Sequence, residues 1–194
     1  MNASLRSAVF LAFICGTGLT ACSKQESAAA AVAESAPAAS AGPTDDPCAL
    51  VSKSEVRDVF PGAESGKRDH KMDQYGVASC TWELPTNILA VQTYKSKNSA
   101  ADELRGRMLG FLDPLKPGLR ESIQYDTIAG LGDEAAVVAV KADEAHGILA
   151  DSAMLSVRRG ERFTILFTST LVDGDVAASK KALEALGRKA ASRL

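Results

Sequence analysis

The side chains best suited to acid–base or nucleophilic chemistry are scarce in this sequence of 194 residues. It has two histidines, His70 and His146, and both lie in polar segments that contain no nucleophile motif. A zinc peptidase would show an HExxH pattern and a serine hydrolase would show GxSxG, but neither pattern occurs. We therefore predict that both histidines are solvated, that the protein is not an enzyme and that it uses no cofactor.

Two short motifs have some features of ligand sites but lack the rest of the pattern. The run Asp173-Gly174-Asp175 has the acidic spacing of a calcium loop, yet the other EF-hand ligands are missing, so we interpret it as a helix cap. The run Gly130-Leu131-Gly132-Asp133-Glu134-Ala135 lacks the third glycine of a dinucleotide fingerprint, and no helix follows it. Its glycines favour a sharp bend between strands. We predict no metal site.

Aromatic and basic side chains are the candidates for noncovalent ligand binding. Arg158 and Arg162 flank a predicted hairpin tip and could meet an anionic group, although charged side chains there also protect a sheet edge. Trp82, Tyr94 and Tyr125 could line a pocket if one face of the sheet is open. Core packing is the simpler role for Trp82.

The first 22 residues predict export and lipidation. Arg6 precedes an apolar run over 8–15 that is too short to span a membrane, and small residues follow, as in a bacterial signal peptide. The run Leu19-Thr20-Ala21-Cys22 resembles the lipobox of bacterial lipoproteins. That resemblance implies a signal peptide over 1–21, a diacylglyceryl group on the Cys22 thiol and often a palmitoyl group on the new amino terminus. An ordinary signal peptide with an incidental cysteine is the alternative.

The lipid chains would anchor the protein to a membrane of the cell envelope. Ser23 follows the modified cysteine, and in Gram-negative lipoproteins this pattern resembles export to the outer membrane, facing the periplasm. Residues 22–47 are rich in Ala, Ser and Pro and contain no aromatic residue, which predicts a lipidated cysteine and a flexible tether. A helix packed on the domain is the alternative for the tether. We expect the globular domain over 48–194.

Cys48 and Cys80 are the cysteines left in the domain once Cys15 is removed with the signal peptide and Cys22 carries lipid. An oxidising envelope compartment favours one structural disulfide between them. A CxxC redox pair or a zinc site would require closer spacing or further ligands.

The domain shows helical and strand patterns in clusters. Ser52-Lys53-Ser54-Glu55 reads as a capping box for a helix that ends at Phe60, and Ser99 caps a second helix. Asp173 or Asp175 caps a final helix. A polar loop is expected over 63–75, and strands are expected over 78–84, 88–94, 122–128, 134–141, 148–158 and 162–171. This order favours the α+β class, with a single twisted antiparallel sheet and about three helices packed mainly on one face.

Three fragments carry a family resemblance: the run from Cys48 to Val56, the run Ser79-Cys80-Thr81-Trp82 and the glycine-containing run over 130–135. In this order they look like small lipoprotein domains of unknown function common in actinobacteria. Those domains are similar in turn to the extracytoplasmic sensor domain of mycobacterial receptor Ser/Thr kinases. The resemblance covers roughly residues 48–170 and implies a twisted antiparallel sheet, a disulfide and a ligand groove. The kinase sensor has two disulfides, whereas one is possible here, and no catalytic residues carry over.

The charges are balanced, with 22 basic and 24 acidic residues and a net charge of −2, which argues against nucleic-acid binding. We expect a lipid-anchored envelope lipoprotein whose domain binds an envelope protein or a small ligand without catalysis. The alternatives are a structural or scaffolding envelope protein without a small ligand and, third, a lipid-anchored hydrolase with an acidic site.

Overall fold

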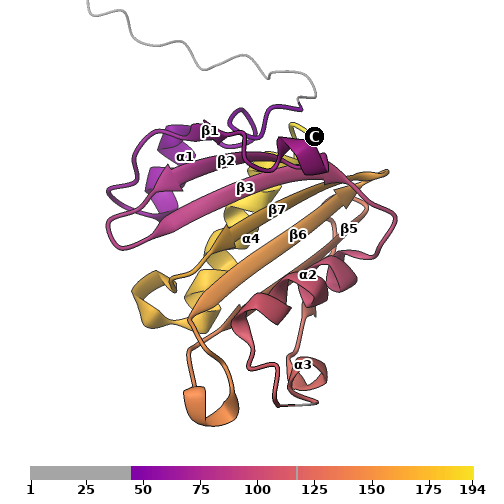
Figure 1. Cartoon of the computed structure of the whole chain (residues 1–194). Coiled ribbons are helices and arrows are strands. Elements are labelled where there is room, and N and C mark those ends of the chain that lie inside the picture. The colour runs from indigo at the N-terminus through magenta and orange to yellow at the C-terminus, as the bar shows by residue number, and fades with distance from the viewer. Residues whose placement is uncertain (1–44, 117) are drawn as a thin grey trace, which may run out of the picture. The chain divides into compact units, whose positions relative to one another are not determined.

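Seven antiparallel strands form one sheet in the order β1-β2-β3-β7-β6-β5-β4 (Figure 1). The computed structural model describes residues 45–116 and 118–194, so the predicted signal peptide, Cys22 and most of the tether lie outside the described residues. The strands are β1 (Lys67–Asp69), β2 (Ala78–Glu83), β3 (Ile88–Lys95), β4 (Asp126–Thr127), β5 (Glu134–Val140), β6 (Ser152–Arg159) and β7 (Arg162–Thr168). The predicted single antiparallel sheet is confirmed.

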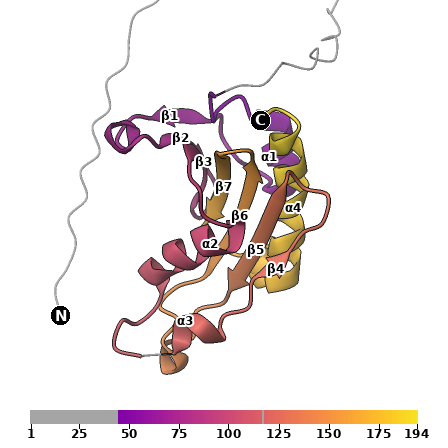
Figure 2. The same ribbon diagram turned by 90° about the vertical axis from the view of Figure 1, so that its right-hand side faces the viewer.

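The helices cover both faces of this sheet. They are α1 (Lys53–Val59), α2 (Ala100–Met108), the single turn α3 (Leu119–Ser122) and α4 (Val176–Ala191), with 3₁₀ turns η1 (Asp73–Tyr75), η2 (Leu109–Phe111), η3 (Glu144–His146) and η4 (Val172–Gly174). Figure 2 shows α1 and α4 on one face and α2 on the other. The α+β class is confirmed, and two of its three longer helices share a face.

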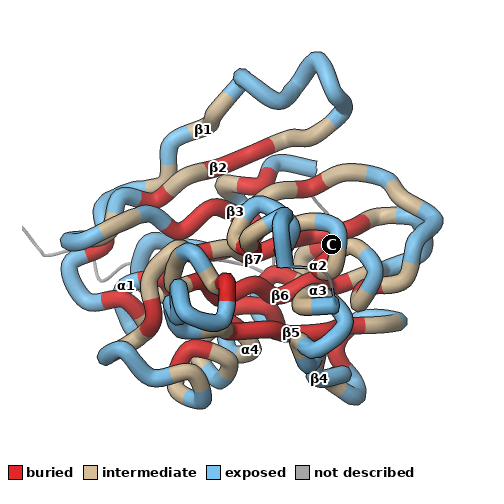
Figure 3. The backbone as a smooth tube through the Cα atoms, turned by 60° about the horizontal axis from the view of Figure 1, so that its bottom comes forward, coloured by how far each residue is buried: buried red, intermediate tan, exposed pale blue. Residues whose placement is uncertain are grey.

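The sheet separates two hydrophobic cores, because alternate residues of each strand point to opposite faces. Cys80 and Trp82 of β2 join Leu183 of α4 in the first core. Leu104 of α2 and Phe163 of β7 belong to the second core. Each fully buried side chain of this size contributes roughly 1.5–3 kcal/mol. The buried residues concentrate in the central strands, whereas the loops are mostly exposed (Figure 3).

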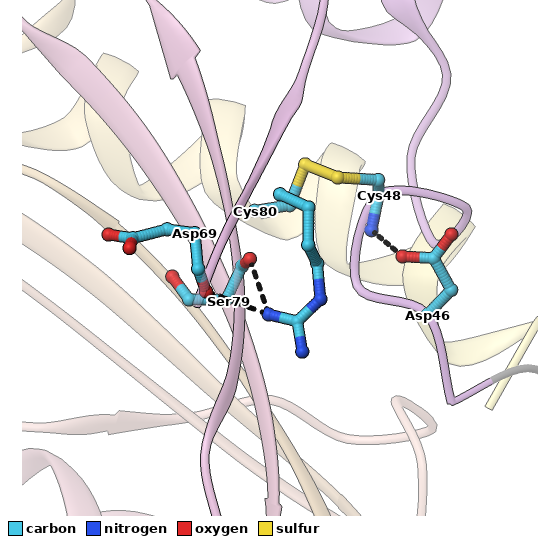
Figure 4. Close-up of a disulfide and its surroundings, with 6 residues drawn as sticks. Asp46, Cys48, Asp69, Ser79 and Cys80 are labelled. Atoms are coloured by element: carbon cyan, nitrogen blue, oxygen red, sulfur yellow. Dashed lines mark hydrogen bonds between the residues drawn. A yellow bond between two sulfur atoms is a disulfide. The ribbon is translucent and has the colours of Figure 1, made fainter. Parts of the chain in front are cut away.

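The Cys48–Cys80 disulfide joins the segment before α1 to the fully buried middle of β2, with a Cα–Cα distance of 5.1 Å (Figure 4). The Asp46 carboxylate accepts a hydrogen bond from the Cys48 backbone nitrogen at 2.9 Å. Pro47 is buried. The last residues assigned to the tether therefore contact the domain.

The structure differs from the sequence-based strands in several places. The expected strand over 148–158 begins only at Ser152, and the strand expected over 162–171 ends at Thr168. The expected polar loop over 63–75 contains the edge strand β1, which is three residues long and too short to show an alternating pattern. The expected strand over 122–128 is wrong for most of its length, because the chain forms β4 only at Asp126–Thr127. Ile123 and Tyr125 instead pack beside the second core as partly buried side chains. The alternating apolar residues that predicted a strand are therefore residues of a loop that pack against the second core.

The predicted capping box at the start of α1 also connects α1 to α4. The Ser52 hydroxyl accepts from the Glu55 backbone nitrogen, and the Glu55 carboxylate accepts from the Ser52 backbone nitrogen at 2.7 Å. Arg193, just beyond α4, donates to both oxygens of Glu55, each at 2.8 Å. The hydrogen bonds from Arg193 outweigh burial and, together with that from Ser52, lower the pKa of Glu55 to about 2.

This pair predicts acid-sensitive stability. The pKa of Glu55 rises to 4.5 in the unfolded chain, so its contribution is complete above pH 4.5 and is lost as the pH falls toward 2. We expect Glu55→Gln to lower the free energy of unfolding by about 2–3 kcal/mol at pH 7 and by much less at pH 2, as measured by urea unfolding.

Glu184→Gln is the matched control, because Glu184 forms a surface pair with Arg188 within one helix. Loss of the Glu184–Arg188 pair should lower the free energy of unfolding by less than about 0.5 kcal/mol. The same cost for Glu55→Gln at pH 7 and at pH 2 would contradict the prediction.

Candidate functional site

A pocket of about 500 Å³ lies at the end of the sheet where β2 begins, β3 ends and β7 begins. We call it the tether-end pocket, and it is lined by Asp45, Tyr75, Gly76, Val77, Ala78, Thr93, Tyr94, Lys95 and Arg162. Its volume is within the range of small-molecule sites. The charged lining residues are two cations and one carboxylate.

A short turn positions the outer wall of this pocket. Arg68 of β1 donates to Asp73 at 2.8 Å, and the other oxygen of Asp73 contacts Nδ1 of His70 at 2.7 Å. The His70 hydrogen bond, followed by that from Arg68, lowers the pKa of Asp73. Gly76 then adopts a φ of 71°, which turns the chain back into β2 and leaves Tyr75 69% exposed at the pocket.

Arg162 forms the basic part of the opposite wall. It lies at the start of β7, where its Nη2 donates to the Asp45 carboxylate and its Nη1 donates to the Leu194 backbone oxygen at 3.4 Å. The Thr93 hydroxyl of β3 donates to the Asp45 backbone oxygen at 3.4 Å. Lys95 is exposed at the end of β3. The first described residue of the chain thus lies at the edge of the pocket, where it contacts the two neighbouring strands β3 and β7.

Tyr94 also lines the pocket, but its hydroxyl serves a different contact. Its ring stacks on Phe163 at a centroid distance of 5.8 Å, and its hydroxyl donates to Glu103 of α2 at 2.5 Å. Burial, and then the bond to Glu103, raises the pKa of Tyr94 well above its usual value. Burial opposes ionisation of Glu103, but hydrogen bonds from Ser96, Tyr94 and Asn98 outweigh it and lower the pKa of Glu103. This network attaches α2 to β3.

The remaining candidate ligand residues do not line the tether-end pocket. Trp82 is 1% exposed in the first core. The Arg105 guanidinium lies 5.2 Å from the ring centre of Tyr125. Arg158 pairs with Glu134 at 3.0 Å. The structure therefore brings together only Tyr94 and Arg162 of the five candidates.

The other motifs with possible chemistry have local partners. His146 contacts Asp143 at 2.6 Å, much as His70 contacts Asp73, and both histidines are largely exposed. Asp175, one of the two expected caps, accepts from the Ala178 backbone nitrogen at 2.6 Å and begins α4. Within residues 45–116 and 118–194, no three His, Cys, Asp or Glu side chains are grouped so as to hold a metal ion. Over the same residues, no helix has the length and apolar character to cross a membrane.

Sequence reasoning selected Tyr94 and Arg162 and missed the other lining residues of the pocket, among them the polar or aromatic side chains of Asp45, Tyr75, Thr93 and Lys95. Asp45 was assigned to the tether and Tyr75 to a polar loop, and neither segment has a pattern that indicates a pocket. Lys95 directly follows the predicted strand over 88–94, so a cation at a strand end was the one available signal. Comparison of the chain with protein-family models, curated proteins and solved structures found no match.

Proposed function

We propose that this protein is a lipid-anchored cell-envelope lipoprotein whose domain binds a ligand without catalysis. The run Leu19-Thr20-Ala21-Cys22, directly after a signal-like apolar segment, carries the anchoring part of the proposal. The tether-end pocket supports the binding part, because a concave site of this volume with a few polar groups suits a small molecule. The three fragments that resemble actinobacterial lipoprotein and kinase sensor domains favour the same role.

The pocket offers little support for the hydrolase alternative. Hydrolysis by acidic residues needs two carboxyl groups about 5–10 Å apart. Among the residues that line the tether-end pocket, Asp45 is the one carboxylic acid, and Arg162 neutralises it. A scaffolding role is the second candidate. The exposed side chains of Leu109, Leu115 and Leu149 favour it, since apolar side chains in water suit a protein contact.

The anchor is tested by metabolic labelling of cells with an alkyne analogue of palmitate. We expect the wild-type chain to carry the label and to sediment with membranes, whereas Cys22→Ala carries no label and accumulates unprocessed or soluble. Globomycin, which blocks lipoprotein signal cleavage, should also leave the precursor uncleaved.

Cys15→Ala is the matched control, because Cys15 belongs to the predicted signal peptide and should be absent from the mature protein. Its labelling should equal that of wild type. Label that persists in Cys22→Ala, with unchanged membrane sedimentation, would refute lipidation at this residue.

A further inference from the structure

The chain itself places a carboxylate in the tether-end pocket. The Asp45 side chain is 95% exposed, whereas that of its partner Arg162 is 29% exposed. An ion pair with one so exposed member is screened by water and salt and stabilises the contact only weakly. The contact shows that Arg162 holds a carboxylate at this position, and the weakness of so exposed an ion pair means that its loss costs little free energy.

The rest of the pocket suits a larger molecule than a bare anion. Tyr75 presents an exposed aromatic ring, and Val77 and Ala78 add apolar surface at the start of β2. Lys95 supplies a second positive charge. Once the Asp45 carboxylate leaves, the charged side chains of the lining are both cationic, and this charge attracts an anionic ligand.

A polar group next to the lining residue Thr93 also lacks a partner among the described residues. Thr164 lies beside Thr93 in the β3–β7 register, on the same face of the sheet. It is fully buried, and its hydroxyl has no hydrogen-bond partner in the described part of the chain. A buried hydroxyl without a partner is costly, so the site next to Thr93 has hydrogen-bonding capacity that the described residues leave unused.

We propose that the tether-end pocket binds a small molecule in which a carboxylate or phosphate is attached to an apolar or aromatic body, and that its oxyanion displaces Asp45 from Arg162. This inference rests on the proposed binding function and names its ligand class. It also links binding to the tether, because Asp45 belongs to the tether segment and its ion pair with Arg162 is one of the contacts of that segment with the domain. A ligand oxyanion and the Asp45 carboxylate compete for Arg162, so ligand binding removes this one contact between the tether segment and the domain.

The test uses the full chain in a non-ionic detergent, with titration calorimetry of four probes. Benzoate and phenyl phosphate carry the two oxyanions on an aromatic ring, benzamide is the neutral isostere of benzoate, and inorganic phosphate has no apolar body. We expect one of the aromatic oxyanions to bind at least tenfold more tightly than benzamide and than inorganic phosphate. Whether benzoate or phenyl phosphate binds more tightly identifies the oxyanion.

Variants then test the displacement of Asp45. Asp45→Asn should tighten binding about twofold to fivefold, which corresponds to a surface ion pair of modest strength. Asp46→Asn removes the same charge one residue away and should have a smaller effect. Arg162→Gln should weaken binding at least tenfold, whereas Arg159→Gln, on the same hairpin but outside the pocket, should stay within twofold of wild type. If Arg162→Gln fails to fold, Lys95→Gln at an exposed position should weaken binding at least threefold.

Equal affinities for benzoate, phenyl phosphate and benzamide, or no binding of either oxyanion, would overturn the proposal. Equal effects of Asp45→Asn and Asp46→Asn would overturn the displacement. Failure of the Cys22 labelling test would not alter these titrations, whereas negative titrations with normal labelling would reject the oxyanion site alone.

Discussion

Reduction of the Cys48–Cys80 disulfide should lower the free energy of unfolding by about 3.5 kcal/mol, because the bond closes a loop of about 33 residues in the unfolded chain. The bond also holds the segment before α1 against β2, where Cys80 is fully buried. Urea unfolding with and without a phosphine reductant measures the loss. The fluorescence of Trp82, the single tryptophan, reports on the same core.

The control is Cys22→Ala, which leaves this pair intact and should lose the same free energy on reduction. Mass spectrometry of peptides prepared without reductant should show Cys48 linked to Cys80. Free thiols at both positions, or equal urea midpoints before and after reduction, would reject a stabilising disulfide.

Gly132→Ala is expected to destabilise the domain by about 3 kcal/mol. Gly132 has a φ of 66°, and a Cβ there would collide with the backbone oxygen of Arg158 and lie 2.9 Å from Cγ1 of Val157. The left-handed backbone costs roughly 1–2 kcal/mol for a residue with a side chain, and crowding against β6 adds about as much. The β6 backbone cannot yield freely, since Arg158 also accepts a hydrogen bond from Asp133 at 2.8 Å.

Gly130→Ala separates the two effects. Gly130 has a similar φ of 69°, but a Cβ there would meet no atom within 4 Å. Gly130→Ala should therefore lower the free energy of unfolding only by the cost of a left-handed backbone, about 1–2 kcal/mol. Thermal or urea unfolding of both variants gives the comparison, and equal losses at the two glycines would show that the contact with β6 does not matter.

Local patterns predicted the elements whose physics is local. The capping box at Ser52 depends on two residues three positions apart, and alternation in β2 depends on residues two apart. The hairpin after Arg159 needs a two-residue turn, with Gly160 at a φ of 61°. The expected bend over 130–135 likewise depends on glycines that adopt positive φ values. Each of these features is decided by neighbours along the chain.

The candidate site was less predictable because its residues belong to different elements. Arg162 and Tyr94 were selected by residue type, but nothing in the sequence distinguished them from Arg158, Tyr125 or Trp82. Only pairing of β3 with β7 places Lys95 opposite Arg162 and Tyr94 opposite Phe163. The two strands are separated in the sequence by α2, β4, β5 and β6. Sheet order therefore decides which candidates share a pocket.

The sequence by itself determined the α+β class, the cysteine pair and most helices and strands, because these follow from short-range periodicity, capping and residue chemistry. It also supplies the basis for the proposed lipid anchor at Cys22, which no contact in the described residues bears on. Tertiary structure alone decided the contacts between distant residues: Asp45 meets Arg162 across 117 positions and Glu55 meets Arg193 across 138. The physical reason is that these contacts form only once the strands have taken their order in the sheet and α4 has packed on it. The free energy of the whole domain, rather than that of neighbouring residues, sets this arrangement.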